Sequence, residues 1–91
     1  KNGTNNADDC IVTNNIVINV DRYGVRSSAH DCLIGGNRIH NSGFDNIFID
    51  SSPGADDNIV FNNRLSDGTD ADIDDNGTGT TLDANLTGPA N

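Results

Sequence analysis

The sequence contains no methionine, no tryptophan and no glutamate, and it has only four aromatic side chains among 91 residues. All fourteen acidic residues are aspartate, which bonds its own backbone in turns, whereas glutamate favours helices. Only five cations oppose them, which gives a net charge of −9. Because contacts to phosphate need clustered cations, we expect no nucleic-acid partner.

Long apolar runs are also missing. The sequence has no stretch of about 18 apolar residues and no hydrophobic signal-peptide core, so we expect no contact with a membrane. It begins with Lys1 rather than methionine, which indicates processing or excision from something longer. Export is the commoner cause in repeat proteins of this kind, and we therefore expect an extracellular or cell-surface location.

A conventional core would be thin, because hydrophobic residues make up 33 % of the chain and a chain this small buries only roughly 60 to 65 % of its unfolded surface. An internal repeat indicates how the chain can still form a core, because stacked repeats bury their apolar residues against one another. Equivalent segments begin at Ala7, Ala29 and Ala55, so the second repeat is slightly longer than the first. We predict one domain over 1–91, with repeats at 7–28, 29–54 and 55–80 and a tail at 81–91.

Apolar residues within each repeat alternate at period two over short stretches, which is strand spacing. In the second half of each repeat the best alignment spaces equivalent residues by 24 and 24, as in Val25, Ile49 and Ile73. A loop at Ser51–Gly54 would absorb the difference. Stacking the repeats so that each strand pairs with its equivalent predicts an all-β fold, a short parallel β-helix (β-solenoid) of about three coils of 22–26 residues.

One short motif recurs in every repeat, as Asn15-Ile16-Val17, Asn37-Arg38-Ile39 and Asn63-Arg64-Leu65. With an apolar residue three places earlier, it resembles the pectate-lyase-like right-handed parallel β-helix repeats, over roughly residues 7 to 80. The resemblance implies that the three asparagines form an internal ladder at a strand corner. It says little about activity, because that family includes lyases, hydrolases, epimerases, phage tailspikes and structural proteins.

Candidate catalytic residues do not complete a known set. Tyr23-Gly24 and His30-Asp31 invite comparison with mannuronan epimerases, but Val25-Arg26-Ser27 replaces the expected Asp-Pro. The elements that accompany the aspartate pair of polygalacturonases are also missing. We therefore predict no catalytic and no cofactor-binding residue. The remaining candidates are expected to serve structure, with His30 between Asp8 and Asp56, Arg26 paired with Asp50, and His40 facing solvent.

Two acidic features raise the question of a metal. Asp70–Asp75 begins like a calcium loop, but Asp75 stands where glycine and Thr81 where glutamate would be needed. Asp70, Asp72 and Asp74 should instead share an outward, solvated strand face. The column Asp9, Asp31 and Asp57 stacks three like charges, so calcium stays open there; otherwise we predict no metal and no cofactor.

Two covalent features are left open by the sequence. Cys10 and Cys32 fall in one column, with Cα atoms expected about 5 Å apart, which suits either a disulfide or two stacked thiols. Sequons for N-glycosylation occur at Asn2, Asn76 and Asn85, but the composition produces about as many by chance.

These features predict a non-catalytic structural protein that assembles head to tail into an extracellular fibre. We see no capping helix at either terminus, and Asn2-Gly3-Thr4 recurs as Asn76-Gly77-Thr78, about three coils later. An outward apolar column at Ile11, Leu33 and Ile59 predicts lateral contact with another protomer or a terminal segment. The alternative is that the chain forms the C-terminal coils of a polysaccharide-degrading enzyme or phage tailspike. Contact with a polysaccharide stays open.

Overall fold

The computed structural model describes residues 10–28, 30–50 and 56–88, and every regular element in these ranges is a β-strand. The strands are short, as expected from the brief period-two runs. Their bounds are β1 (Ile11–Thr13), β2 (Ile16–Ile18), β3 (Val25–Ser27), β4 (Leu33–Gly35), β5 (Arg38–His40), β6 (Asp45–Ile49), β7 (Ile59–Phe61), β8 (Arg64–Ser66), β9 (Ala71–Asp75) and β10 (Thr81–Asp83).

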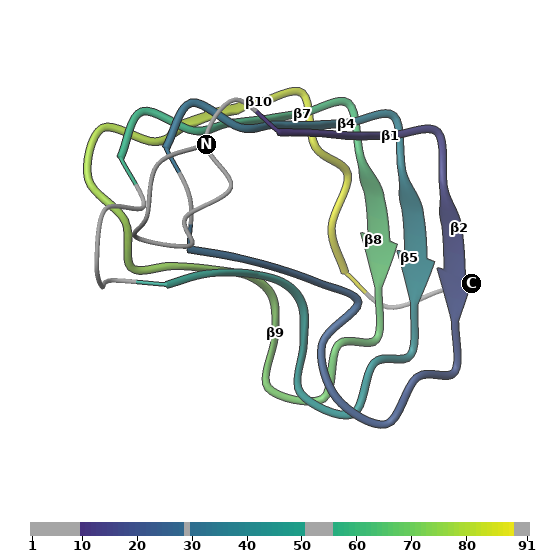
Figure 1. Cartoon of the computed structure of the whole chain (residues 1–91). Helices are drawn as coiled ribbons and strands as arrows, with labels where there is room; N and C mark the ends of the chain where they lie inside the picture. The colour runs from purple at the N-terminus through teal and green to yellow at the C-terminus, as the bar shows by residue number, and fades with distance from the viewer. Residues whose placement is uncertain (1–9, 29, 51–55, 89–91) are drawn as a thin grey trace.

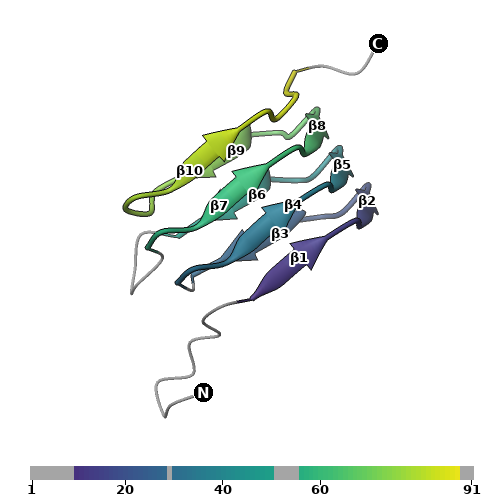
Figure 2. The ribbon, with the colours of Figure 1, turned by 90° about the horizontal axis from the view of Figure 1, so that it is seen from above.

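The strands form three parallel sheets that make the walls of a solenoid (Figure 1). The first sheet has the order β1-β4-β7-β10, the second β2-β5-β8 and the third β3-β6-β9. Figure 2 shows the coils stacked one above another, with β1 at one end of the stack and β10 at the other. The predicted all-β parallel β-solenoid of about three coils is therefore confirmed.

Successive coils advance the chain by 22, 26 and 22 residues. In the first sheet Leu33 pairs with Ile11 and Ile59, and Ile59 pairs with Thr81. The third sheet keeps the same spacing, since Ile47 pairs with Val25 and Ile73. The predicted spacing of 24 and 24 is wrong. A shift of two residues leaves the inward and outward alternation unchanged, so the apolar pattern could not detect it.

The register also contradicts the expectation that Asn76-Gly77-Thr78 lies three whole coils after Asn2-Gly3-Thr4. Three coils carry the chain from Ile11 to Thr81. The same advance counted from Asn2 ends at Asp72 rather than at Asn76, so the recurrence does not span a whole number of coils. Residues 2–4 lie outside the described residues. The additional length of the second coil falls between β6 and β7.

Residues with positive φ turn the chain at three points of each coil, which explains the wealth of asparagine and aspartate. These side chains and glycine enter the left-handed region most readily. The first corner, before the second sheet, uses Asn14, Gly36, Asn62 and Ala84; the second, after that sheet, uses Asn19, Asn41 and Asp67; the third, before the first sheet, uses Asp31, Asp57 and Gly79.

Inward apolar columns form a narrow core. Its fully covered members lie in the middle coils and are Ile34, Ile39, Ile47, Ile49, Val60 and Leu65. The next column along the first sheet points outward, with Ile11 69 % and Ile59 42 % exposed. The predicted outward apolar column is confirmed.

An asparagine ladder follows the first corner, as the resemblance implied. Asn37 donates its backbone N–H and its amide Nδ2 to Oδ1 of Asn63, at 2.9 and 3.0 Å, and Asn15 donates in the same way to Asn37. Nδ2 of each upper asparagine returns to a backbone carbonyl of the coil below, as in the 3.0 Å bond from Asn63 to Ile34. Asn85 adds a fourth rung that the sequence analysis missed.

A disulfide joins Cys10 to Cys32, with Cα atoms 4.6 Å apart, so the alternative of two stacked thiols is excluded. The next residue of this column, Asn58, accepts a 2.8 Å hydrogen bond from the backbone N–H of Cys32. The disulfide ties the first coil to the second at the corner that leads into the first sheet.

Part of the tail continues the stack. β10 pairs with β7, and Leu86 bridges Arg64 in the second sheet, so residues 81–86 begin a fourth coil. Within the described ranges no helix has the length and apolar character to cross a bilayer.

Candidate functional site

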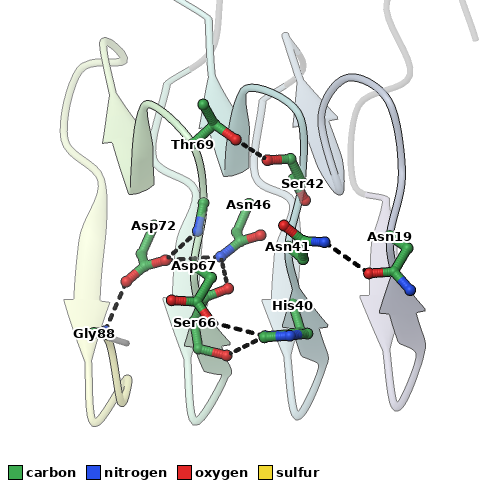
Figure 3. Close-up of polar contacts among 11 residues, drawn as sticks. Asn19, His40, Asn41, Ser42, Asn46, Ser66, Asp67, Thr69, Asp72 and Gly88 are labelled. Atoms are coloured by element: carbon green, nitrogen blue, oxygen red, sulfur yellow. Dashed lines mark hydrogen bonds and ion pairs between the residues drawn. The ribbon is translucent and has the colours of Figure 1, made fainter. Parts of the chain in front are cut away.

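Polar side chains gather at the second corner and beside it (Figure 3). His40 Nδ1 lies 2.7 Å from Ser66 Oγ and 3.5 Å from Asp67 Oδ2. Ser66 is the cross-strand partner of His40 in the second sheet. Asp67 belongs to the turn that follows, so the sequence pattern did not associate it with His40.

The three residue types suggest a relay, but their geometry does not form one. In a serine, histidine and aspartate triad, the carboxylate orients one ring nitrogen and the other nitrogen takes the proton from the hydroxyl. Here Ser66 and Asp67 both approach Nδ1 of His40. The arrangement can therefore tie the second coil to the third, but it does not prepare Ser66 as a nucleophile.

Asp72 is the centre of a second set of hydrogen bonds in Figure 3. Its Oδ1 accepts from Nδ2 of the buried Asn46 at 2.7 Å and from the Gly68 N–H at 3.1 Å, and its Oδ2 accepts from the Gly88 N–H at 2.7 Å. The prediction that Asp72 joins a solvated outward face is wrong. The chain turns a corner at the start of β9, and this side chain faces the turn and the segment after β10.

An open hollow of about 240 Å³ lies beside this network, lined by Asn19, Val20, Asp21, Asn41, Ser42, Gly43 and Thr69. Nδ2 of Asn41 donates to Oδ1 of Asn19 at 2.8 Å across its rim, and Thr69 Oγ1 donates to the Ser42 carbonyl at 2.8 Å. Ser42 Oγ is buried without a described partner. The hollow can hold water or a small polar molecule.

The predicted ion pairs are partly confirmed. Arg26 and Asp50 lie 2.9 Å apart, although Arg26 stacks under Phe48 rather than under Asp50. His30 Nδ1 lies 3.7 Å from Asp56, as expected for that column. Asp8, the third member, lies outside the described residues. Such exposed pairs each contribute only about 0.2 to 1 kcal/mol.

Three of the four aromatic side chains meet on the outer side of the third sheet. The Tyr23 ring lies 5.4 Å from the Phe44 ring and 4.9 Å from the Phe48 ring, centroid to centroid. The guanidinium of Arg26 lies over Tyr23 and Phe48, and that of Arg22 lies over Phe44. Because cations already occupy ring faces, this cluster holds the corner together rather than presenting an open platform for a sugar.

Asp45 is a buried carboxyl, with 3 % of its surface exposed, and its Oδ1 has no described hydrogen-bond partner. Burial raises the pKa of this carboxyl, and the nearby carboxylates of Asp74 and Asp70 raise it further. The backbone N–H of Ala71 opposes the shift of the pKa. Folding therefore makes this carboxyl easier to protonate than it is in the unfolded chain.

Replacing Asp45 by asparagine is expected to stabilise the protein at neutral pH. With its pKa raised by folding, Asp45 contributes full stability below the ordinary pKa of 3.8 and loses that contribution as the pH rises through the raised pKa. Asp45→Asn keeps the acceptor for Ala71 without the charge, and should raise the free energy of unfolding at pH 7 by on the order of 1 kcal/mol.

Urea unfolding at pH 7 and pH 3 measures this effect, and the gain should shrink at the lower pH. Asp83→Asn, which removes an exposed charge that does not act on Asp45, is the matched control and should change stability by less than about 0.5 kcal/mol. If Asp45→Asn were less stable than the native chain at pH 7, the ionised carboxylate of Asp45 would not destabilise the folded state.

The acidic column proposed for calcium is only partly described. Asp31 and Asp57 lie in equivalent turns, one coil apart, and Asp9 lies outside the described residues. In residues 10–28, 30–50 and 56–88, no three histidine, cysteine or acidic side chains are grouped so as to hold a metal ion.

The two described sequons differ in their surroundings. Asn76 is exposed, with Nδ2 bonded to Asp74 at 3.0 Å. Nδ2 of Asn85 bonds the Val60 carbonyl at 2.9 Å inside the ladder, so a glycan there would displace a rung. Asn2 lies outside the described residues.

No family model, curated protein or solved structure matches this chain.

Proposed function

We propose that this chain is a non-catalytic structural subunit that stacks end to end on copies of itself into an extracellular fibre. The observation that carries this proposal is the polarity of the asparagine ladder. In each step, the lower asparagine donates from its backbone N–H and Nδ2 to Oδ1 of the asparagine one coil above. The ladder therefore ends in acceptors on one side and donors on the other.

The two ends of the ladder are complementary. At the β1 end, Oδ1 of Asn15 accepts no hydrogen bond from the described residues, while at the β10 end the backbone N–H of Asn85 donates none to them. A copy placed above the β10 end would bring its Asn15 over Asn85. The contact would then repeat the bonds of 3.0 and 3.1 Å that join Asn63 to Asn85 within the chain.

The apolar column beside the ladder supports the same contact. Val60 is fully buried beneath Leu82, whereas Leu82, the last member of the column, is 50 % exposed. At the other end Val12 is half-buried. Covering both ends would remove apolar surface from water, which stabilises the contact by roughly 25 cal/mol for each Å² buried.

Unpaired strand edges provide the remaining contacts. β1 and β10 are the edge strands of the first sheet, and β9 is an edge strand of the third. At the β10 end the first sheet extends one strand further than the third, and an incoming copy would pair with both exposed edges. Exposed parallel edges pair readily with another chain. Such a head-to-tail contact does not close on itself and therefore propagates as a filament.

An extracellular or cell-surface location agrees with the disulfide between Cys10 and Cys32, because such bonds persist in oxidising compartments. The alternative, that these are the last coils of a polysaccharide-degrading enzyme or tailspike, predicts that the chain remains a monomer when it is isolated.

Leu82→Lys tests the joint. Leu82 lies at the open end of a column, so lysine there should fold normally but place a charge inside the contact between copies. We expect the native chain to sediment as polymers at pH 7 and the variant as a monomer of 9.6 kDa.

Ile59→Lys is the matched control for Leu82→Lys, because Ile59 faces outward from the middle of the stack and is 42 % exposed. This variant should still form polymers. Equal assembly of the two lysine variants would argue against a joint at the end of the column.

A further inference from the structure

Two arginines on the outer face of the second sheet have no acidic partner among the described residues. Arg38 of β5 and Arg64 of β8 are direct cross-strand partners, and both are exposed. The ion pairs of the described residues involve Arg26, His30 and His40 instead. Like charges directly opposite each other on strands about 4.8 Å apart destabilise a sheet.

Two aspartates form the opposite pair at the third corner. Asp31 and Asp57 are exposed, have φ of 55° and 57°, and each precedes by two residues a member of the paired positions Leu33 and Ile59. Among the described residues no ion pair involves either carboxylate. They are thus a second like-charge pair, stacked one coil apart.

The two pairs belong to the same two coils but to opposite sides of the solenoid. The turns that lead into β4 and β7 lie at the far end of those strands from the second sheet (Figure 1). Each side therefore displays two charges at the same spacing along the stack. A sideways shift of one copy, without rotation or displacement along the axis, brings the arginine pair against the aspartate pair of a neighbour.

We propose that solenoids associate side by side in this way, with Arg38 and Arg64 of one copy paired with Asp31 and Asp57 of the next. A second copy satisfies both pairs at once, whereas a small anion or an acidic polymer would satisfy the arginines and leave the aspartates uncompensated. The contact is heterologous, so it propagates into a row of solenoids. It does not require end-to-end stacking, but in a fibre each added subunit repeats it and raises the avidity.

The net charge of −9 opposes association only at low salt. The Debye length is about 10 Å at 0.1 M ionic strength, so repulsion between the bodies of two copies is largely screened while ion pairs in contact remain. Near 1 M salt the pairs weaken as well. Surface ion pairs of this kind are individually weak, so the contact between two isolated copies is short-lived and calls for covalent capture.

A variant with Arg38→Lys and Arg64→Lys makes such capture specific, since the chain has no lysine besides Lys1. The variant is mixed in unlabelled and ¹⁵N-labelled form at 0.1 M NaCl and treated with a water-soluble carbodiimide. The reagent activates a carboxylate, and a neighbouring amine displaces it to form an amide, with the oxygen leaving in the urea by-product. We expect amides of mixed isotope between the introduced amines and Asp31 or Asp57, with a several-fold loss near 1 M NaCl.

Adding Asp31→Asn and Asp57→Asn should abolish these amides, and asparagine tolerates the positive φ at both positions. Adding Asp21→Asn and Asp70→Asn instead, with the same change in charge elsewhere, should leave them unchanged. The proposal would be overturned if the amides formed only within single copies, or if they joined the introduced amines to other carboxylates of a neighbour. It would also be overturned if no amide formed. Failure of end-to-end stacking would not remove these amides, because they join the sides of two solenoids.

Discussion

Asn63→Ala will lower the free energy of unfolding by about 4 kcal/mol, which is the sum expected for one buried N–H left without a partner and three further lost hydrogen bonds. Asn63 is 1 % exposed and stands in the middle of the ladder. Without its side chain, the buried N–H of Asn37 loses its described partner. Asn37 Nδ2, the Ile34 carbonyl and Asn85 Oδ1 each lose one hydrogen bond. A buried group without a partner costs about 1 to 3 kcal/mol, and an ordinary hydrogen bond contributes about 0.5 to 1.5 kcal/mol. The loss at the Asn37 N–H is therefore the largest single part of the effect.

Urea unfolding of the purified variants measures this difference. Asn15→Ala is the matched control. Asn15 is exposed and lies at the end of the ladder, so its removal leaves no buried carbonyl of a preceding coil without a hydrogen bond. Asn15→Ala should lower the free energy of unfolding by less than about 1 kcal/mol. Equal losses at positions 15 and 63 would mean that burial of the ladder contributes little to stability.

Reduction of the disulfide between Cys10 and Cys32 will lower the free energy of unfolding by about 3 kcal/mol. The two cysteines are 22 residues apart, and closing a loop of that length removes entropy from the unfolded chain worth about 3 kcal/mol at 25 °C. The bond also fixes the first coil, which has a neighbour on one side only, so β1 should lose protection from amide exchange first.

Urea midpoints with and without a reductant test the bond, and the variant with Cys10→Ser and Cys32→Ser shows whether the reductant acts on anything else. The double variant should resemble the reduced protein and should not respond to reductant. A native chain whose midpoint stays the same on complete reduction would contradict the expected contribution.

The columns of the first two sheets were readable from the sequence. Asn15, Asn37 and Asn63 recur in phase with the apolar residues, and that phase follows directly from strands stacked in parallel register. Asn85 could have been found by advancing from Asn63 by the 22 residues that separate Asn15 from Asn37. The predicted tail at 81–91 obscured this fourth rung.

The third sheet could not be placed as well. Spacings of 22 and 24 leave the same side chains inward, and only the backbone pairing of Val25 with Ile47 distinguishes them. The position of the additional residues in the second coil depends on where the chain bulges, which hydrophobic alternation does not record.

Contacts between turn residues were also beyond the sequence pattern. Tyr23 and Phe44 meet through the shape of the second corner rather than through a shared column. Asp67 approaches His40, and Asp72 accepts three hydrogen bonds, because the chain changes direction beside them. Each contact depends on the path of a turn, and residue spacing alone does not specify that path.

Oriented fibre diffraction of the native assembly tests end-to-end stacking most directly. If copies continue the coils, strands stay perpendicular to the fibre axis and successive strands repeat along it, so a reflection near about 4.8 Å should lie on the meridian. Leu82→Lys should give no oriented fibres under the same conditions. A monodisperse monomer of 9.6 kDa at high concentration, or fibres whose strand-spacing reflection lies on the equator, would contradict the stacking of solenoids end to end.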